Sequence, residues 1–212
     1  MKKYHKIQSI YKRDERTNYK TFIEGDYSLP VFRYLRNVEW EFTEKIDGTN
    51  IRVIWDGERV EFRGKSDRAQ IPPHLLEKLT LLFPPEKFTE MSPRTLYGEG
   101  YGVKIQKVGK RYIPDDCNFI LFDVAINEKW LPSDVVTEIA YELKIDRVPI
   151  LCTGTLDDAV VMCKKGFKSE LMDYEPEGLV CRTAYNDLHT SSGRIITKLK
   201  LKDFRYKNRG TI

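Results

Sequence analysis

Alternating apolar and polar residues predict several β-strands along the chain. Residues 38–43 alternate strictly between apolar and polar side chains, which is the pattern of a strand with one buried face. Residues 51–55 and 60–62 flank an Asp56-Gly57 turn, and this arrangement predicts a hairpin. Further strands are expected at the nearly continuous apolar run 119–126, which predicts a buried central strand, and at 178–183 and 194–202.

Three segments with helical periodicity interrupt these strands. Pro72-Pro73 opens a helix whose apolar face is built from leucines, and Pro84-Pro85 ends it. A second helix is expected after Ser133 or Asp134 as its cap, and a third between a Thr155/Asp158 capping pair and Gly166. Strands interrupted by helices in this order predict an α+β fold with mainly antiparallel sheets. Because the chain contains no Gly/Ser-rich linker, we expect a single domain over residues 1–212.

The composition of the chain argues against a membrane protein, a secreted protein and a disulfide-rich protein. Hydrophobic residues make up 41% of the 212-residue chain, and no apolar run approaches the length of a membrane span or follows the basic N-terminus as a signal sequence would. The four cysteines are widely spaced, which favours free thiols in a reducing cytosol over a zinc site or a disulfide framework.

The charge of the chain is unevenly distributed. Residues 1–20 hold seven Lys/Arg against two acidic residues, and residues 194–212 hold seven against one. The net charge is only +4, so the segment between these ends is acidic. Basic ends suit a polyanionic partner, although solvated termini explain the same pattern.

The segment with the clearest chemical potential is Glu44-Lys45-Ile46-Asp47-Gly48-Thr49-Asn50, between two predicted strands. A lysine amine is a nucleophile only when unprotonated, and burial near other cations lowers its pKa. Asp47 and Gly48 would form the turn that follows Lys45. Alone, such a sequence is also typical of an ordinary surface turn.

A second candidate is the strand predicted at 194–202, which alternates with period two. Its Lys198, Lys200 and Lys202 would share one face as a row of ammonium groups about 7 Å apart. Such a row can neutralise charge during phosphoryl transfer, but an edge strand protected by lysines has the same pattern.

Three further segments carry isolated candidates. Glu177 precedes the strand at 178–183 and could point into a cleft. Glu99 lies among glycines that would let the backbone approach a ligand, and Phe122 could stack on a base or belong to the core.

Together these residues form an ordered set that resembles the covalent nucleotidyltransferases, the superfamily of RNA ligases, DNA ligases and mRNA capping enzymes. The set runs through Lys45-x-Asp47-Gly48, Glu99, Phe122-Asp123, Glu177-Gly178 and Lys198-x-Lys200. The first motif, EKIDGTN, is similar to that of ATP-dependent ligases of the phage RNA ligase 2 type, because asparagine stands where DNA ligases and capping enzymes usually have arginine. The segments GKSDRAQIP, YGEGYG and KLKLKDF also resemble small RNA ligases, so the resemblance spans nearly the whole chain.

This resemblance implies a nucleotidyltransferase domain with a nucleotide cleft between its sheets, and it implies a role for each matched residue. Lys45 would attack ATP and carry AMP as a phosphoramidate. Glu99 would contact the ribose or a metal-bound water, Phe122 would stack on adenine, and Glu177 would organise the metal. Lys198 and Lys200 would contact the phosphates. Further contacts with the nucleotide would come from Glu44, Ile46 and Asn50.

The resemblance leaves one contact open and implies the partners. A basic residue after the first hairpin would contact the nucleotide, and Arg63, Lys65 and Arg68 all compete for that role, of which Lys65 and Arg68 are retained. The expected cofactors are ATP and Mg²⁺ or Mn²⁺, and the expected partners are RNA ends, joined in RNA repair by a monomeric cytosolic enzyme of a bacterium or a phage-infected cell. Neither an OB-fold nor a helical domain fits in the residues after Lys200.

Two other functions remain open at this point. A DNA nick-sealing or capping-type nucleotidyltransferase would share the same motifs, although the asparagine at position 50 and the missing OB-fold count against it. A non-catalytic RNA-binding module on the same core would be expected to have lost Lys45, Glu177 or Lys198, and all three are present.

Overall fold

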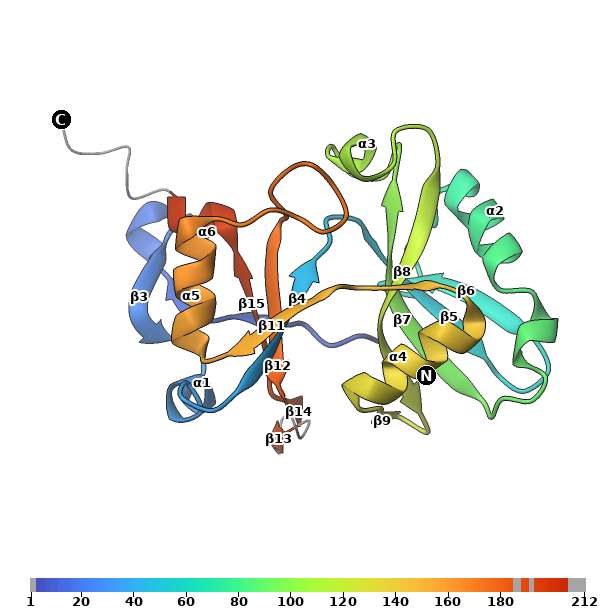
Figure 1. Cartoon of the computed structure of the whole chain (residues 1–212), viewed down its shortest axis with the longest axis horizontal. Helices are drawn as coiled ribbons and strands as arrows, with labels where there is room; N and C mark the ends of the chain where they lie inside the picture. The colour runs from blue at the N-terminus through green and yellow to red at the C-terminus, as the bar shows by residue number, and fades with distance from the viewer. Residues whose placement is uncertain (1–2, 185–187, 191–192, 206–212) are drawn as a thin grey trace. The chain divides into compact units, whose positions relative to one another are not determined.

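The computed structural model describes residues 3–184, 188–190 and 193–205. Contacts along the chain divide it into two compact units. Unit 1 comprises Ile46–Val148 together with the first residues up to His5, and unit 2 comprises Lys6–Lys45 and the chain from Pro149 onward (Figure 1). The chain therefore passes from unit 2 to unit 1 directly after Lys45. The single adenylation domain expected from the sequence stays a prediction.

Unit 1 is built on a mainly antiparallel sheet. Its strand order is β10-β8-β7-β5-β6, and β9 pairs with the end of β8 at Ala125 and Ile126. Only the β10–β8 pairing is parallel among the described pairs of this sheet. The strands are β5 (Thr49–Trp55), β6 (Val60–Gly64), β7 (Arg94–Gly102), β8 (Cys117–Ile126), β9 (Lys129–Trp130) and β10 (Asp146–Arg147).

Helices α2 (Pro73–Leu82) and α4 (Ser133–Leu143) bury their apolar faces in the core of unit 1. Leu75 and Leu79 of α2 and Ile139 of α4 pack with alternate residues of β5 and β8, because one face of each strand points to the core. The shorter helices η2 (Pro85–Phe88) and α3 (Gly109–Tyr112) lie in the connections before β7 and β8.

One lysine joins the ends of both long helices of unit 1. The Lys87 ammonium donates to the carbonyl oxygens of Leu82 at 2.9 Å and of Leu143 at 2.7 Å, which are the last residues of α2 and α4. Neither helix has a basic residue in its own last turn. Lys87 therefore satisfies carbonyl groups that both helix ends leave without a partner in the helix, and burial lowers its pKa.

The central strand β8 contains a bulge. Tyr97 of β7 faces Asp123, but the next residue, Gly98, faces Leu121, so Phe122 is the extra residue on β8. The core positions of β8 change accordingly, since Phe119 and Leu121 are followed in the core by Val124. The bulge therefore breaks the simple alternation of the strand at Phe122-Asp123.

Unit 2 is built on a second sheet with strand order β1-β15-β12-β4-β11. Helix α5 (Leu156–Lys165) packs on one face of this sheet, together with the apolar residues of β4, β12 and β15 (Figure 1). The strands are β1 (Gln8–Ser9), β4 (Trp40–Lys45), β11 (Ile150–Gly154), β12 (Gly178–Thr183) and β15 (Ile196–Lys200). The other elements are β2 (Tyr11–Arg13), η1 (Glu15–Thr17), β3 (Phe22–Tyr27), α1 (Pro30–Tyr34), β13 (His189–Thr190), β14 (Gly193–Arg194) and α6 (Leu201–Arg205).

Most of the elements expected from the sequence are confirmed, with two corrections. The third predicted helix has the predicted capping box, in which the Thr155 and Asp158 side chains each accept from the backbone of the other. Helix α4 instead begins after Pro132, with no side-chain cap. The strand expected over 194–202 spans only Ile196–Lys200, because Arg194 belongs to β14 and Leu201 starts α6. Lys202 therefore does not belong to the row of lysines on the strand.

The cysteines are free thiols, as expected, with Cys152 exposed and the other three buried. Within the described part of the chain, no helix combines the length and the apolar character that crossing a bilayer requires.

Candidate active site

Three of the predicted site residues meet on adjacent strands of unit 2. Lys45 ends β4, Glu177 immediately precedes β12, and Lys200 ends β15. The Lys45 Nζ donates to Glu177 Oε2 at 2.5 Å, and Lys200 forms an ion pair with the other oxygen, Glu177 Oε1. Strand register explains the meeting, because Gly178 pairs with Lys45 on one side and with Lys200 on the other.

The same register places Lys198 on the face that carries Lys45. Val180 pairs with both Thr43 and Lys198, one step of two residues along the sheet from the pairing of Gly178 with Lys45 and Lys200. Since side chains alternate along a strand, the Lys198 and Lys200 side chains share this face, as expected from the sequence. Lys45, Glu177 and Lys200 are thus in direct contact, and Lys198 is the neighbour of Lys200 on the same strand face.

The Glu177 carboxylate is the electrostatic centre of this group. Its side chain is only 14% exposed, while those of Lys45 and Lys200 are 22% and 23% exposed. Burial by itself would raise the pKa of Glu177, but the charges and hydrogen bonds of Lys45 and Lys200 outweigh burial and lower that pKa below its ordinary value. Glu177 is therefore ionised at neutral pH and partly neutralises two cations.

Glu44, expected near the nucleotide, points to the opposite face of β4. It pairs with Leu179, whose side chain lies in the core of unit 2, and its own side chain is 2% exposed. Its carboxylate accepts from the Ser169 hydroxyl at 2.6 Å and from the Glu170 amide at 2.9 Å. Burial raises the pKa of Glu44 despite these hydrogen bonds. Through these hydrogen bonds, Glu44 anchors the segment that follows α5.

The turn after Lys45 is held by the segment between β7 and β8 of unit 1. The Asp47 amide donates to the Tyr112 hydroxyl at 3.2 Å, and the Gln106 amide group donates to the Gly48 carbonyl at 3.0 Å. Gly48 has no space for a side chain, because a Cβ would lie 2.2 Å from the Gly100 carbonyl oxygen. Ile46, at which the chain enters unit 1 after Lys45, is buried at 4% exposure.

Asn50 and Glu99 lie directly opposite each other on β5 and β7 of unit 1. Both are partly buried, and the Asn50 Oδ1 is a buried acceptor that finds no hydrogen-bond donor among the residues 3–184, 188–190 and 193–205. Buried acceptors are nearly always satisfied, so this oxygen is suited to a donor group from a ligand.

The glycines that flank Glu99 serve packing instead of ligand approach. A Cβ on Gly98 would lie 2.1 Å from the ring of Phe119, and one on Gly100 would lie 2.5 Å from Leu75. Both glycines alternate with Glu99 and so face the core, which corrects the expectation that they let the backbone approach a ligand. Phe122, the predicted adenine contact, lies in the same sheet at the bulge of β8 and is half-buried.

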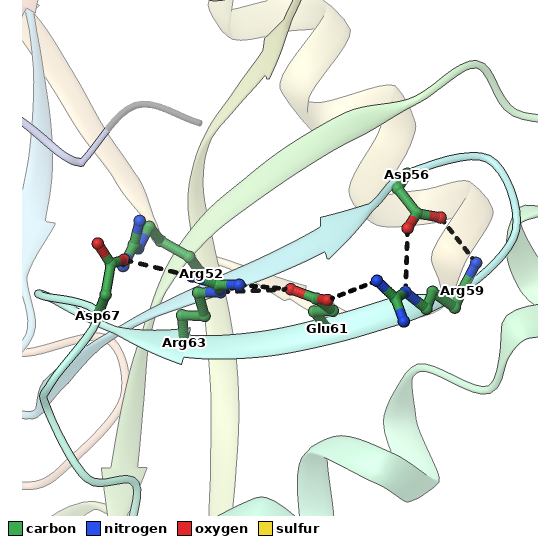
Figure 2. A network of polar contacts seen from close by, with 6 residues as sticks. All are labelled: Arg52, Asp56, Arg59, Glu61, Arg63 and Asp67. Carbon is green, nitrogen blue, oxygen red and sulfur yellow. Dashed lines mark hydrogen bonds and ion pairs between the residues drawn. The ribbon is translucent and has the colours of Figure 1, made fainter.

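The two retained candidates for the basic contact, Lys65 and Arg68, are exposed on the loop after β6. This loop is anchored by Arg52 of β5, a residue that is 1% exposed. The Arg52 guanidinium donates to Asp67 Oδ1 at 2.7 Å and to the Gly64 carbonyl at 3.0 Å (Figure 2). The hydrogen bond from Arg52 lowers the pKa of Asp67 below its ordinary value.

Figure 2 also shows how the third candidate, Arg63, is engaged. Its guanidinium pairs with Glu61 at 2.9 Å, and it lies 3.7 Å from Asp67. Glu61 in turn pairs with Arg59, which pairs with Asp56. Because Arg63 is already bound to carboxylates, the structure favours Lys65 and Arg68 as the side chains available to a ligand.

No three acidic, histidine or cysteine side chains among the described residues lie close enough to hold a metal ion by themselves. The two predicted metal residues, Glu99 and Glu177, belong to different units. Single carboxylates suit Mg²⁺ or Mn²⁺ held mainly by water and by substrate phosphates.

Several residues that shape the site were not found from the sequence. Arg52 is a charged residue within an apolar strand, and Gln106, Tyr112 and Ser169 carry no local signal in the sequence. All four act through contacts between segments that are distant in sequence, which neither spacing nor periodicity can indicate.

Comparisons with known proteins identify the family and the fold. Residues 38–200 match the family described as RNA ligase. No curated protein shows a significant match to the chain.

Solved structures of an RNA ligase from Naegleria gruberi share the fold. A mutant of that ligase with ATP and Mn is 19% identical with a TM-score of 0.65, over 82% of this chain and 54% of that one. The same ligase with pyrophosphate is 17% identical with a TM-score of 0.66, over 91% and 55%, and an apo mutant is 17% identical with a TM-score of 0.67, over 95% and 57%.

The chain therefore spans little more than half the length of these solved ligases. At this low sequence identity, the structural similarity establishes the fold alone. It confirms the predicted α+β nucleotidyltransferase architecture with mainly antiparallel sheets. The family match covers residues 38–200, from the strand that carries Lys45 to the end of the strand that carries Lys200, and this chain belongs to the RNA ligase family.

Proposed function

We propose that this protein is an ATP-dependent RNA ligase that carries AMP on Lys45 and joins RNA 5′-phosphate and 3′-hydroxyl ends. The observation that carries the proposal is the Glu177 carboxylate, which joins Lys45 to Lys200 across three strands of unit 2. A nucleophile for phosphoryl transfer needs a fixed amine and nearby cations that neutralise the phosphate.

The first step would form a bond between Lys45 Nζ and the α-phosphorus of ATP. The Lys45 ammonium first loses a proton to solvent, so that the neutral amine attacks. The bond from that phosphorus to the oxygen shared with the β-phosphate breaks, pyrophosphate leaves, and the second proton that the phosphoramidate nitrogen sheds also passes to solvent. Glu177 orients Nζ through the hydrogen bond at 2.5 Å. Lys200 and Lys198, on the face that carries Lys45, stabilise the charge that builds up on the phosphate oxygens.

Two further steps return the enzyme to its starting state. An oxygen of the RNA 5′-phosphate attacks the α-phosphorus of the adduct, and the bond to Lys45 Nζ breaks. The RNA 3′-hydroxyl then attacks the activated 5′-phosphate, AMP leaves, and a phosphodiester bond remains. Splitting the reaction into three displacements lowers each barrier.

Residues of unit 1 support recognition of the nucleoside. The buried Asn50 Oδ1 is suited to accept from a ribose hydroxyl or an adenine amino group, and Glu99 lies opposite to it in the sheet. Phe122 offers an aromatic ring for base stacking, and we retain it as the adenine contact. Lys65 and Arg68 stay proposed phosphate contacts on the loop that Arg52 anchors.

This chain could hold a divalent cation only if substrate phosphates and water supply most of the ligands. Glu177 and Glu99 would each offer a carboxylate, and Mg²⁺ or Mn²⁺ typically binds through one or two carboxylates together with substrate phosphates and water. When bound, the cation would neutralise phosphate charge and assist the departure of pyrophosphate. The Naegleria gruberi structures with ATP and Mn, and with AMP and Mn, support this choice.

A basic segment that contacts the turn after Lys45 supports RNA as the polynucleotide substrate. The segment between β7 and β8, which contacts Asp47 and Gly48, carries four exposed cationic residues and no acidic one from Val103 to Ile113. These are Lys104, Lys107, Lys110 and Arg111. Cations clustered on one segment suit the phosphates of an incoming strand.

The nucleophile is tested with ATP labelled at the α-phosphate. The denatured protein should keep the label, Lys45→Ala and Lys45→Arg should not, and EDTA should prevent labelling. Label retained by the Lys45→Ala variant would contradict the assignment.

The polynucleotide is tested with matched nicked duplexes. An RNA nick with a 5′-phosphate and a 3′-hydroxyl should be sealed, while a nick in an all-DNA duplex should be sealed more slowly. Equal or faster sealing of DNA, or labelling by GTP in place of ATP, would instead indicate a DNA ligase or a capping-type enzyme. The cytosolic setting and the monomeric state stay predictions from the sequence.

A further inference from the structure

Tyr4 lies in an aromatic cluster of unit 1, although the chain continues directly into unit 2 from Lys6. Its ring centre is 4.9 Å from that of Phe122 at an interplanar angle of 69°, and 5.3 Å from that of Tyr97. It also contacts the rings of Trp130 at 5.4 Å and His5 at 4.8 Å. Tyr4 and His5 are therefore packed on the sheet that carries Phe122.

The hydroxyl group of Tyr4 makes a second contact with the same part of β8. It donates to Asp123 Oδ2 at 2.5 Å, and Asp123 is 1% exposed. Successive residues of a regular strand point to opposite faces, so one side chain could not normally contact both Phe122 and Asp123. The bulge at Phe122 makes this possible, because it brings two successive side chains to the face where Tyr4 lies.

We propose that Tyr4 is a positioning residue for nucleotide binding, which holds the Phe122 ring in the orientation that accepts the adenine base. This inference rests on the proposed function. A half-buried phenylalanine at a bulge has rotational freedom, and a base that stacks on it must first restrict that freedom. Tyr4 removes this cost beforehand, since its ring abuts Phe122 while its hydroxyl is bound to the next residue.

Tyr4 leaves at least one face of the Phe122 ring uncovered by its own ring. Two rings inclined at 69° meet edge to face, so Tyr4 covers at most one face of Phe122. The hydroxyl acts as the fixed point of the contact, because Asp123 is buried in the central strand of the sheet. Removal of the hydroxyl alone should therefore loosen the ring without removing the aromatic packing.

The test measures the rate of adduct formation against ATP concentration for the full-length protein. Tyr4→Phe should raise the KM for ATP by about fivefold and Tyr4→Ala by about tenfold or more, since base stacking on an aromatic ring is worth roughly 1–3 kcal/mol. The maximal rate should change by less than about twofold, because Tyr4 is not placed at the reacting atoms. Inhibition by pyrophosphate, which has no base, should stay unchanged.

Two further variants control for damage to the fold. Tyr141→Phe removes a hydroxyl from α4 of the same unit, where the side chain is 85% exposed, and should leave the KM unchanged. Asp123→Asn weakens the acceptor of the Tyr4 hydroxyl, and its effect on KM should not add to that of Tyr4→Phe. If Tyr4→Phe fails to fold, Asp123→Asn alone must raise the KM for ATP.

The outcomes separate this inference from the function on which it rests. A wild-type protein that forms no adduct overturns both. A wild-type protein that forms one, with Tyr4→Phe or Asp123→Asn lowering the maximal rate and leaving the KM unaltered, overturns the positioning role alone. The same holds if pyrophosphate inhibition weakens in parallel with ATP, because the effect would then not depend on the base.

Discussion

Replacing Glu177 with glutamine removes the charge that Lys45 and Lys200 share but keeps the shape of the side chain. Each charge-assisted hydrogen bond contributes about 1.5–3 kcal/mol when formed in the interior of a protein. The three side chains here are 14–23% exposed, which weakens the effect, and the amide retains one acceptor. We therefore expect Glu177→Gln to lower the free energy of unfolding by about 2 kcal/mol at pH 7.

The free energy of unfolding that Glu177→Gln loses should depend on pH, and this dependence tests the role of the charge directly. The folded-state pKa of Glu177 is held below its ordinary value by the two lysines. A carboxyl with a lowered pKa contributes its full stability above the ordinary value, and the contribution disappears as the pH falls through the folded-state value. The difference between the wild type and Glu177→Gln should thus be largest at pH 7 and shrink as the pH falls below the ordinary carboxyl value and through the lowered folded-state pKa.

Urea denaturation at a series of pH values measures this difference, and Glu175→Gln is the matched control. Glu175 lies two residues away and pairs with Arg205 at the surface, where both side chains are about half exposed, so its loss should be much smaller. Glu177→Gln should also slow adduct formation by about 100-fold. Equal effects of the two substitutions at pH 7, or a difference that does not change on acidification, would refute the assigned role of the charge.

Three other outcomes follow from the described contacts. Gly48→Ala should abolish most adduct formation, because its methyl group would overlap the Gly100 carbonyl; retained activity in the labelling assay would show that the turn can move. Thr155→Ala removes the capping box of α5 and should cost about 1 kcal/mol in a urea titration, and an unchanged midpoint would contradict that role. Glutamine at all four cationic positions of the segment between β7 and β8 should leave adduct formation intact and flatten the salt dependence of RNA affinity by roughly 3 in slope; an unchanged slope would place the RNA elsewhere. These positions are Lys104, Lys107, Lys110 and Arg111.

Local patterns predicted the elements of the fold more closely than their ends. The hairpin around Asp56-Gly57 and the helix capped by Thr155 are determined by neighbouring residues, so periodicity and capping chemistry were sufficient. Helix α4 lacks a side-chain cap although Ser133 and Asp134 stand at its start, because the chain enters the helix at Pro132. The strand expected beyond Lys200 gives way to α6, and alternation alone could not place that boundary.

Motif order in the sequence could group candidate residues, but it could not indicate contacts between distant segments. The meeting of Lys45, Glu177 and Lys200 follows from their positions at the ends of three paired strands. Glu44 is adjacent to Lys45 in sequence, yet strand alternation turns its side chain to the other face, where Ser169 binds it. The bulge at Phe122 was invisible in the sequence, because an extra residue in a continuous apolar run changes no pattern.

The Lys87 ammonium caps the C-terminal turns of both α2 and α4 and so couples the two helix ends. The last turns of α2 and α4 should consequently fray as a pair, with amides near Leu82 and Leu143 exchanging hydrogen in a common opening event. Loss of that ammonium would uncouple the two ends, and any shortened form of the unit that omits residues 85–88 would leave both helices without their shared closure.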